Sequence, residues 1–363
     1  MPRHDLDNFP CRGALATTMR VRVGCEFKYE TQAPVPMLML VRARPDADHE
    51  IRYESQWTEP NLDVREYRDG FGNPCWRLVL PAGAPVVRYD ALVEVSGEAD
   101  PVVPDAPLVP VQELPDDTLV FTLPSRYIES DLLLDDAWRL FSDNPPTWAR
   151  VQAVCDWVHA NVEYGYGLSG PSTTALDVFK QRQGVCRDFA QLSVAFCRAL
   201  NIPARYTFGY LGDIAVEPPD VPMDFHAWFE AYLGGRWHTF DARHNVPRIG
   251  RVKIAHGRDA VDVALSTAYG AATLASMVVW ADEIADHDGG TGEAGSETSP
   301  MPQHLESPAR VLYPGGGTGG STAGTSVTEA TLLVSAGAPT VGPAADDDGD
   351  SPGRGALSAP APG

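Results

Sequence analysis

The sequence predicts an α+β protein in which strands come first, helices follow and strands return before a low-complexity end. Residues 14–96 contain short segments of alternating apolar and polar residues and no helical period of useful length. Residues 125–200 instead place apolar residues at steps of three and four, which is the spacing of amphipathic helices. After about residue 281 the chain consists mostly of small, acidic and proline residues.

These changes in pattern predict four parts. We expect a β-rich, sandwich-like N-terminal domain at 14–96, a linker at 97–124, a mixed helix and strand domain at 125–281, and a disordered tail at 282–363. The linker is rich in proline and acidic residues and cannot sustain a helix or a central strand.

Composition excludes several classes of function. The net charge of -21 argues against nucleic acid and anionic membranes as partners. No apolar run is long enough to cross a bilayer, and the first ten residues do not resemble a signal peptide. The six cysteines lack metal-binding spacing and are expected to be reduced thiols in the cytoplasm. We therefore expect no metal and no cofactor.

Within the N-terminal region, strands are expected at 19–23, 37–41, 76–80 and 91–95, with a turn at 69–73. Farther along, a helical stripe runs from Trp148 to Val162 and is preceded by two prolines. Thr174 and Asp177 have the spacing of a capping box and are expected to start a short helix.

The next helix is expected from about Gly184 to Leu200 and places Cys186 in its first turn. Free backbone N–H groups and the helix dipole favour negative charge at that position. We therefore expect a lowered pKa for the Cys186 thiol and the highest reactivity among the cysteines.

A strand expected at 204–210 is followed by a hairpin around Gly234 and Gly235. If these two glycines form the loop, His226 lies diagonally across from Asp241 on the same face, within reach of a side-chain contact. His238 then lies on the opposite face. A three-residue loop with a bulge would reverse this assignment.

Cysteine, histidine and aspartate in this order are the parts of an activated-thiol site. The thiol needs a base that takes up its proton and later protonates the leaving amine. The base needs an acceptor on its far nitrogen, which fixes its tautomer and orientation. Cys186, His226 and Asp241 can fill these three roles.

Four segments together resemble the core of the transglutaminase-like superfamily, in the order and spacing of its bacterial branch. They are GVCRDFA at 184–190, NIPARY at 201–206, FHAW at 225–228 and WHTFDA at 237–242. The resemblance implies a papain-like α+β catalytic core at 125–281, with Cys186, His226 and Asp241 as the catalytic residues. The region around DGFGN at 69–73 resembles the β domain that commonly precedes this core. The architecture differs from that of animal transglutaminases, and no calcium-binding loop is recognised.

The sequence thus predicts a cysteine hydrolase, a protease or amidase that cleaves a peptide or protein substrate through a thioester. The alternatives are an acyltransferase that passes glutamine side chains to amines, and a catalytically idle adaptor. Cys186 is expected to supply one oxyanion donor through its backbone N–H, with Gln181 or Gln183 as candidates for a second donor. Trp228 and Trp237 are candidate substrate-binding residues.

Overall fold

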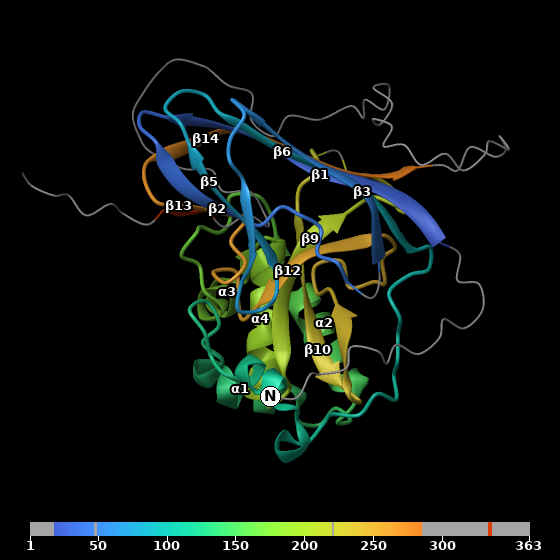
Figure 1. The fold of residues 1–363 in the computed structure, drawn as a ribbon. Coiled ribbons are helices and arrows are strands. Elements are labelled where there is room, and N and C mark those ends of the chain that lie inside the picture. Colours follow the sequence, from blue (N-terminus) through green and yellow to red (C-terminus); the bar gives the residue numbers. More distant parts are fainter. Residues whose placement is uncertain (1–17, 47–48, 220, 285–332, 336–363) are drawn as a thin grey trace, which may run out of the picture.

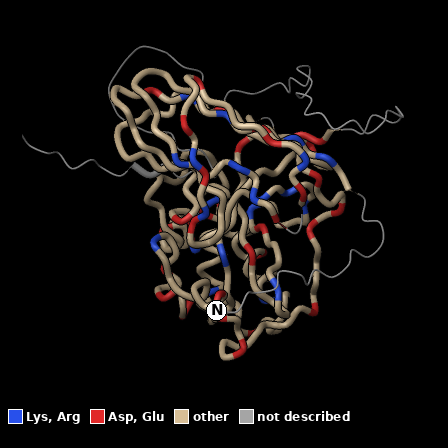
Figure 2. The backbone as a smooth tube through the Cα atoms, viewed as in Figure 1, with Lys and Arg blue, Asp and Glu red and all other residues tan. Residues whose placement is uncertain are grey.

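A computed structural model describes residues 18–46, 49–219, 221–284 and 333–335. A long twisted sheet, labelled β1, β3, β6 and β14 in Figure 1, lies across one end of the molecule. The helices, together with β9, β10 and β12, form the other end (Figure 1). Basic and acidic residues are interspersed through both ends (Figure 2).

The long sheet is antiparallel and joins the beginning of the described chain to residues near position 280. Its strand order is β14-β1-β6-β3, with β14 (Ala272–Ile284), β1 (Thr18–Thr31), β6 (Val86–Ser96) and β3 (His49–Glu59). β14 pairs with β1 along its length, from Arg20 opposite Ile284 to Thr31 opposite Ala272. Residues 272–281, which we had predicted to belong with the second domain, therefore complete the N-terminal sheet. Their partner strand lies about 250 residues away in sequence, which local patterns do not reveal.

A second sheet has the order β15-β13-β2-β5-β4. Its strands are β15 (Leu333–Ser335), β13 (Ser266–Ala268), β2 (Val35–Met39), β5 (Pro74–Leu80) and β4 (Arg65–Arg68). The apolar core of these strands is continuous with that of β1 and β6, and it includes Tyr206 and Phe208 of the other end of the molecule. A separate N-terminal sandwich is therefore not confirmed, because the strands share one core with the rest of the chain.

The third sheet carries most of the candidate site residues. It is antiparallel in the order β11-β10-β9-β12, with β11 (Arg236–Phe240), β10 (His226–Leu233), β9 (Ala204–Leu211) and β12 (Arg251–Gly257). Leu233 pairs with Arg236, which confirms the two-residue loop. The loop residues Gly234 and Gly235 have φ values of 57° and 87°, a conformation that glycine adopts without strain.

The helices cover this sheet. They are α1 (Leu134–Phe141), α2 (Trp148–Asn161), α3 (Ala175–Gln181) and α4 (Cys186–Ala199). The predicted helix at 148–162, the short helix that starts after Thr174 and the helix that ends near Leu200 are thus confirmed, as is the capping box between Thr174 and Asp177. Every residue of α4 is buried, because the helix packs against β9 and β10 on one side and against the other helices on another. A short parallel pair, β7 (Glu163–Tyr164) with β8 (Gln183–Gly184), precedes it.

The predicted linker is ordered and packed. It contains the 3₁₀ helices η1 (Val111–Glu113) and η2 (Asp116–Thr122), while η3 (Ser130–Leu133) leads into α1. Phe121 of η2 is buried against Phe71, Trp237 and His256. The expectation of an extended linker is wrong here, because the large apolar side chain of Phe121 anchors the segment to both ends of the molecule.

The turn at 69–73 fastens the N-terminal strands to β12. The Asn73 amide donates to the His256 carbonyl at 2.8 Å, and its oxygen accepts the His256 N–H at 3.0 Å. Asp69 accepts hydrogen bonds from the backbone N–H groups of Phe71 and Asn73, which holds the turn in shape. Asn73 is completely buried and extends the edge of the third sheet by one pair of hydrogen bonds.

Nearly all of the tail predicted to be disordered lies outside the described residues. Residues 282–284 continue β14, and 333–335 form β15. The five cysteines within the described ranges are buried and form no disulfide. No helix in those ranges is long and apolar enough to cross a membrane.

Candidate active site

Cys186 is the first residue of α4, and the residues around it form a compact cap. Asp188 Oδ2 accepts the backbone N–H of Val185 at 2.8 Å, and Asp188 Oδ1 pairs with Arg187 at 3.1 Å. A side chain at Gly184 would place its Cβ 2.7 Å from Cβ of Asp188. Glycine therefore lets the chain turn closely into the helix, and Asp188 and Arg187 shape the helix start.

The Cys186 thiol is completely buried. Burial raises the pKa of this thiol well above its usual value, although a hydrogen bond with the Ala227 backbone acts in the opposite direction. The expectation of a lowered pKa is wrong for this structure, because loss of solvation outweighs the helix start. The bond to Ala227 nevertheless brings the thiol to the residue that follows His226.

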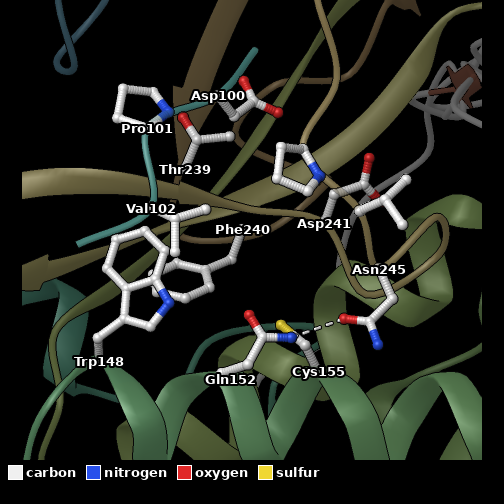
Figure 3. Close-up of a pocket in the computed structure, with 12 residues that line it drawn as sticks. Asp100, Pro101, Val102, Trp148, Gln152, Cys155, Thr239, Phe240, Asp241 and Asn245 are labelled. Carbon is white, nitrogen blue, oxygen red and sulfur yellow. Dashed lines mark hydrogen bonds between the residues drawn. The ribbon is translucent and has the colours of Figure 1, made fainter. Parts of the chain in front are cut away.

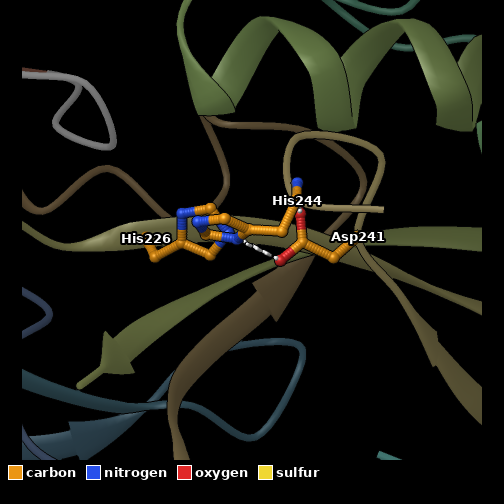
Figure 4. Close-up of side chains that lie close together, drawn as sticks. All are labelled: His226, Asp241 and His244. Carbon is orange, nitrogen blue, oxygen red and sulfur yellow. Dashed lines mark hydrogen bonds and ion pairs between the residues drawn. The ribbon is translucent and has the colours of Figure 1, made fainter. Parts of the chain in front are cut away.

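His226 and Asp241 form a buried hydrogen-bonded pair (Figure 4). Nε2 of His226 lies 2.8 Å from Oδ2 of Asp241, as the hairpin register predicted. Burial lowers the pKa of His226 to about 4 despite the neighbouring carboxylate, so the imidazole is neutral at pH 7. With Nε2 committed to Asp241 as donor, Nδ1 is left as the acceptor nitrogen of the ring.

Asp241 accepts hydrogen bonds from more groups than the sequence indicated. Its Oδ2 also lies 3.0 Å from Nδ1 of His244 and accepts from Nη2 of Arg251 at 2.8 Å. Its Oδ1 accepts the backbone N–H groups of Arg243 and His244. Although burial alone would raise it, His226 and Arg251 hold the pKa of the Asp241 carboxyl well below its usual range.

Sequence reasoning missed His244 and Arg251. His244 follows Asp241 by three residues, a spacing that could have suggested a contact. Arg251 lies on β12, and its Nε also binds both carboxylate oxygens of Asp100, at 3.1 and 2.9 Å. No local pattern links Arg251 or Asp100 to Asp241, because three separate segments meet only in the folded chain.

Ligand atoms of His226, Asp241 and His244 lie within 4.8 Å of one another, which is close enough to consider a metal ion. Oδ2 of Asp241 already accepts from three donors, and one of them is a guanidinium whose charge opposes a second cation. The arrangement therefore fits a hydrogen-bonded network better than a metal site.

Trp228 and Trp237 occupy different surroundings. Trp228 is buried, stacks at 6.3 Å on His226 and lies under Arg251. Trp237 packs against Phe121 and Arg205. It precedes Asp241 by four residues, which corresponds to about 13 Å between the two residues along an extended strand. Their role in substrate binding stays a prediction.

The candidate oxyanion donors are also placed near the start of α4. Gln183 donates to the Leu168 carbonyl at 3.4 Å, and Gln181 ends α3 with its side chain exposed. Their role stays a prediction as well.

A pocket lies beside Asp241, and Figure 3 shows the residues that line it. It encloses about 400 Å³, including space open to solvent, between the segment from Asp100 to Val102 and helix α2. Asp241 lines it, whereas Cys186 and His226 do not. The orienting carboxylate is thus the one member of the predicted set that this pocket reaches.

The chain matches known proteins over this region. The model of the transglutaminase-like superfamily matches residues 139–242. The crystal structure of a candidate cysteine protease from Cytophaga hutchinsonii shares 35% identity, with a TM-score of 0.69 over 74% of this chain and 92% of that one. This chain belongs to the transglutaminase-like superfamily.

Two mycobacterial proteins are also similar to this transglutaminase-like chain. An uncharacterised protein of Mycobacterium leprae is 35% identical over 129 residues, which are 35% of this chain and 46% of that protein. An uncharacterised protein of Mycobacterium tuberculosis is 28% identical over 218 residues, 54% of this chain and 68% of that protein. The match thus spans about half the length of the first relative.

Proposed function

We propose that this transglutaminase-like protein is a cysteine-dependent amide hydrolase, a protease or amidase that acts through a thioester. The observation that carries the proposal is the buried pair of His226 and Asp241, whose Nε2 and Oδ2 atoms lie 2.8 Å apart. The next residue after His226, Ala227, forms a backbone hydrogen bond with the Cys186 thiol. The similarity to a candidate cysteine protease supports the same class of reaction.

In this mechanism the thiol and the imidazole are both neutral at rest. When Sγ of Cys186 attacks the amide carbonyl carbon, the thiol proton moves to Nδ1 of His226. The imidazolium that forms is stabilised by Asp241, which stays ionised because its pKa is held low. The same proton then passes to the leaving amine, and a thioester remains on Cys186.

Water completes the cycle. His226 takes a proton from water as the oxygen attacks the thioester, and returns that proton to the departing sulfur. The tetrahedral oxyanion of each step is held by the backbone N–H of Cys186, one of the N–H groups that a helix start leaves without an intrahelical partner.

The two alternative functions are an acyltransferase and an adaptor without activity. An amine in place of water would give an acyltransferase, which needs a second subsite that positions the amine beside the thioester. We favour water because it needs no such subsite. The third outcome is an adaptor without activity, in which the same residues are retained but no acyl-enzyme forms.

The deciding experiment uses a glutamine-containing peptide, a labelled primary amine in excess and intact-mass detection. A hydrolase gives a transient acyl adduct on Cys186 and more acid or cleaved peptide than amine conjugate. Cys186→Ser should abolish the adduct, whereas Cys197→Ala on the same buried helix should retain it. Excess conjugate would establish the transferase, and absence of any adduct on several peptides would establish the adaptor.

A further inference from the structure

We propose that Arg243 is a carboxylate-binding residue of the substrate site and selects peptides that carry a carboxylate close to the attacked amide. The inference rests on the proposed function and goes beyond it, because it names a class of substrate. It also assigns a role to a side chain that the triad chemistry does not use.

Arg243 lies between the two halves of the proposed catalytic set. Its backbone N–H donates to Oδ1 of Asp241 at 3.1 Å. Its guanidinium carbon lies 3.5 Å from the centre of the Tyr164 ring. Tyr164 pairs with Gly184 in the short sheet that leads into Cys186. The cation is therefore held beside the path from the histidine and aspartate to the cysteine.

The charge of Arg243 lacks a protein partner. Within the described residues its guanidinium forms no salt bridge and no hydrogen bond to a protein group, and it stacks on the Tyr164 ring. Burial lowers the pKa of Arg243, while the nearby Cys186 and Asp241 act in the opposite direction. A partly buried cation without a counter-ion is costly, and the cost is recovered when an anion binds.

Arg187 provides the contrast. It also lies close to Cys186, but it is paired with Asp188 at 3.1 Å and donates to the Gly170 carbonyl at 2.9 Å. Its charge is thus neutralised inside the protein. Arg243 is the neighbouring guanidinium whose hydrogen-bonding fork is still open to a ligand.

The chemistry of that fork favours a carboxylate. A guanidinium binds a carboxylate through two parallel hydrogen bonds, and stacking on an aromatic ring fixes the plane in which it does so. Tyr166, a residue that is 48% exposed, packs at 6.2 Å against Tyr164 and leads from this point to the surface. In a site that attacks amides, the anion that fits is an acidic side chain or the terminal carboxylate of a peptide.

The first test uses alkylation of Cys186, which needs no peptide substrate. The rates with iodoacetate, an anion, and iodoacetamide, its neutral analogue, are measured by mapping the adduct on the full chain. We expect Arg243→Gln to lower the ratio of the iodoacetate rate to the iodoacetamide rate about fivefold. The effect should shrink at high ionic strength.

Arg182→Gln is the matched control, because Arg182 also stacks on aromatic rings, 4.4 Å from those of Trp157 and Phe179. Cys186 is among the groups that act on the charge of Arg243 but not among those that act on the charge of Arg182. This variant should keep the wild-type ratio. An unchanged ratio in Arg243→Gln, or an equal fall in Arg182→Gln, would overturn the inference.

The second test compares peptides that differ only in Glu or Gln beside the cleaved amide, each with a free or an amidated C-terminus. We expect kcat/KM to favour the carboxylate about tenfold in the wild type and hardly at all in Arg243→Gln. A preference that disappears on amidation assigns the terminal carboxylate, and one that survives assigns the side chain. An equal loss of kcat/KM on charged and neutral peptides in Arg243→Gln would overturn the inference but not the proposal that the protein is a hydrolase. Charge-dependent alkylation without any amide cleavage would overturn the hydrolase alone.

Discussion

Asp241→Asn should weaken both the fold and the proposed reaction, since one carboxylate serves both. Its Oδ2 receives His226, His244 and Arg251, and its Oδ1 receives two backbone N–H groups. An amide has only one oxygen, so its NH₂ group must face donors on one side or the other. The substitution also removes the negative charge next to the buried Arg251.

The magnitude follows from these contacts. Removing one partner of a buried ion pair costs about 3–5 kcal/mol. Arg251 keeps its two contacts with Asp100, so we expect the lower end, about 3 kcal/mol of unfolding free energy. Loss of the correct tautomer of His226 should lower turnover about 10⁴-fold, beyond the effect on stability.

Asp100→Asn is the control for this prediction. It removes the other carboxylate on the same guanidinium but leaves the bond between His226 and Asp241 in place. Urea denaturation of both variants gives the stability loss, and turnover is measured at a temperature where both are folded. We expect a comparable stability loss with turnover within about tenfold of the wild type for Asp100→Asn. Near wild-type turnover in Asp241→Asn, or equal turnover losses in both variants, would refute the reasoning.

Three further predictions concern the fold around the site. Asn73→Ala should lower the unfolding free energy in urea by about 2–4 kcal/mol, because it leaves the backbone N–H and C=O of His256 without partners; a loss under about 1 kcal/mol would contradict the fastening role of the turn. Burial lowers the pKa of His226 to about 4 and that of His256 to about 2, so the unfolded chain binds protons first as the pH falls. Stability should therefore fall from about pH 6.5 toward pH 4, by up to about 1.4 kcal/mol per pH unit for each histidine, and a flat profile in pH-dependent denaturation would be inconsistent with two buried neutral imidazoles. Gly184→Ala should lower thermal stability and any Cys186-dependent activity together, since the added Cβ would lie 2.7 Å from Cβ of Asp188; wild-type melting would show that the helix start adapts.

Local sequence determined the elements that carry the site. The apolar spacing after Gly184 predicted α4 with Cys186 in its first turn, and the structure begins the helix at Cys186. Two adjacent glycines predicted the hairpin register, and that register brings His226 to Asp241. These features depend on periodicity, capping and turn conformation, which act between residues close in sequence.

Only the tertiary structure decided the environment of those residues. The pairing of β14 with β1 joins segments about 250 residues apart, and Phe121 orders a segment that its prolines and acids alone would leave extended. The raised pKa of the Cys186 thiol depends on how completely the folded chain excludes water from it. The contacts of Arg251 with Asp241 and of Arg243 with Tyr164 likewise join separate segments. Burial and long-range contacts are properties of the packed chain as a whole, so no window of the sequence contains them.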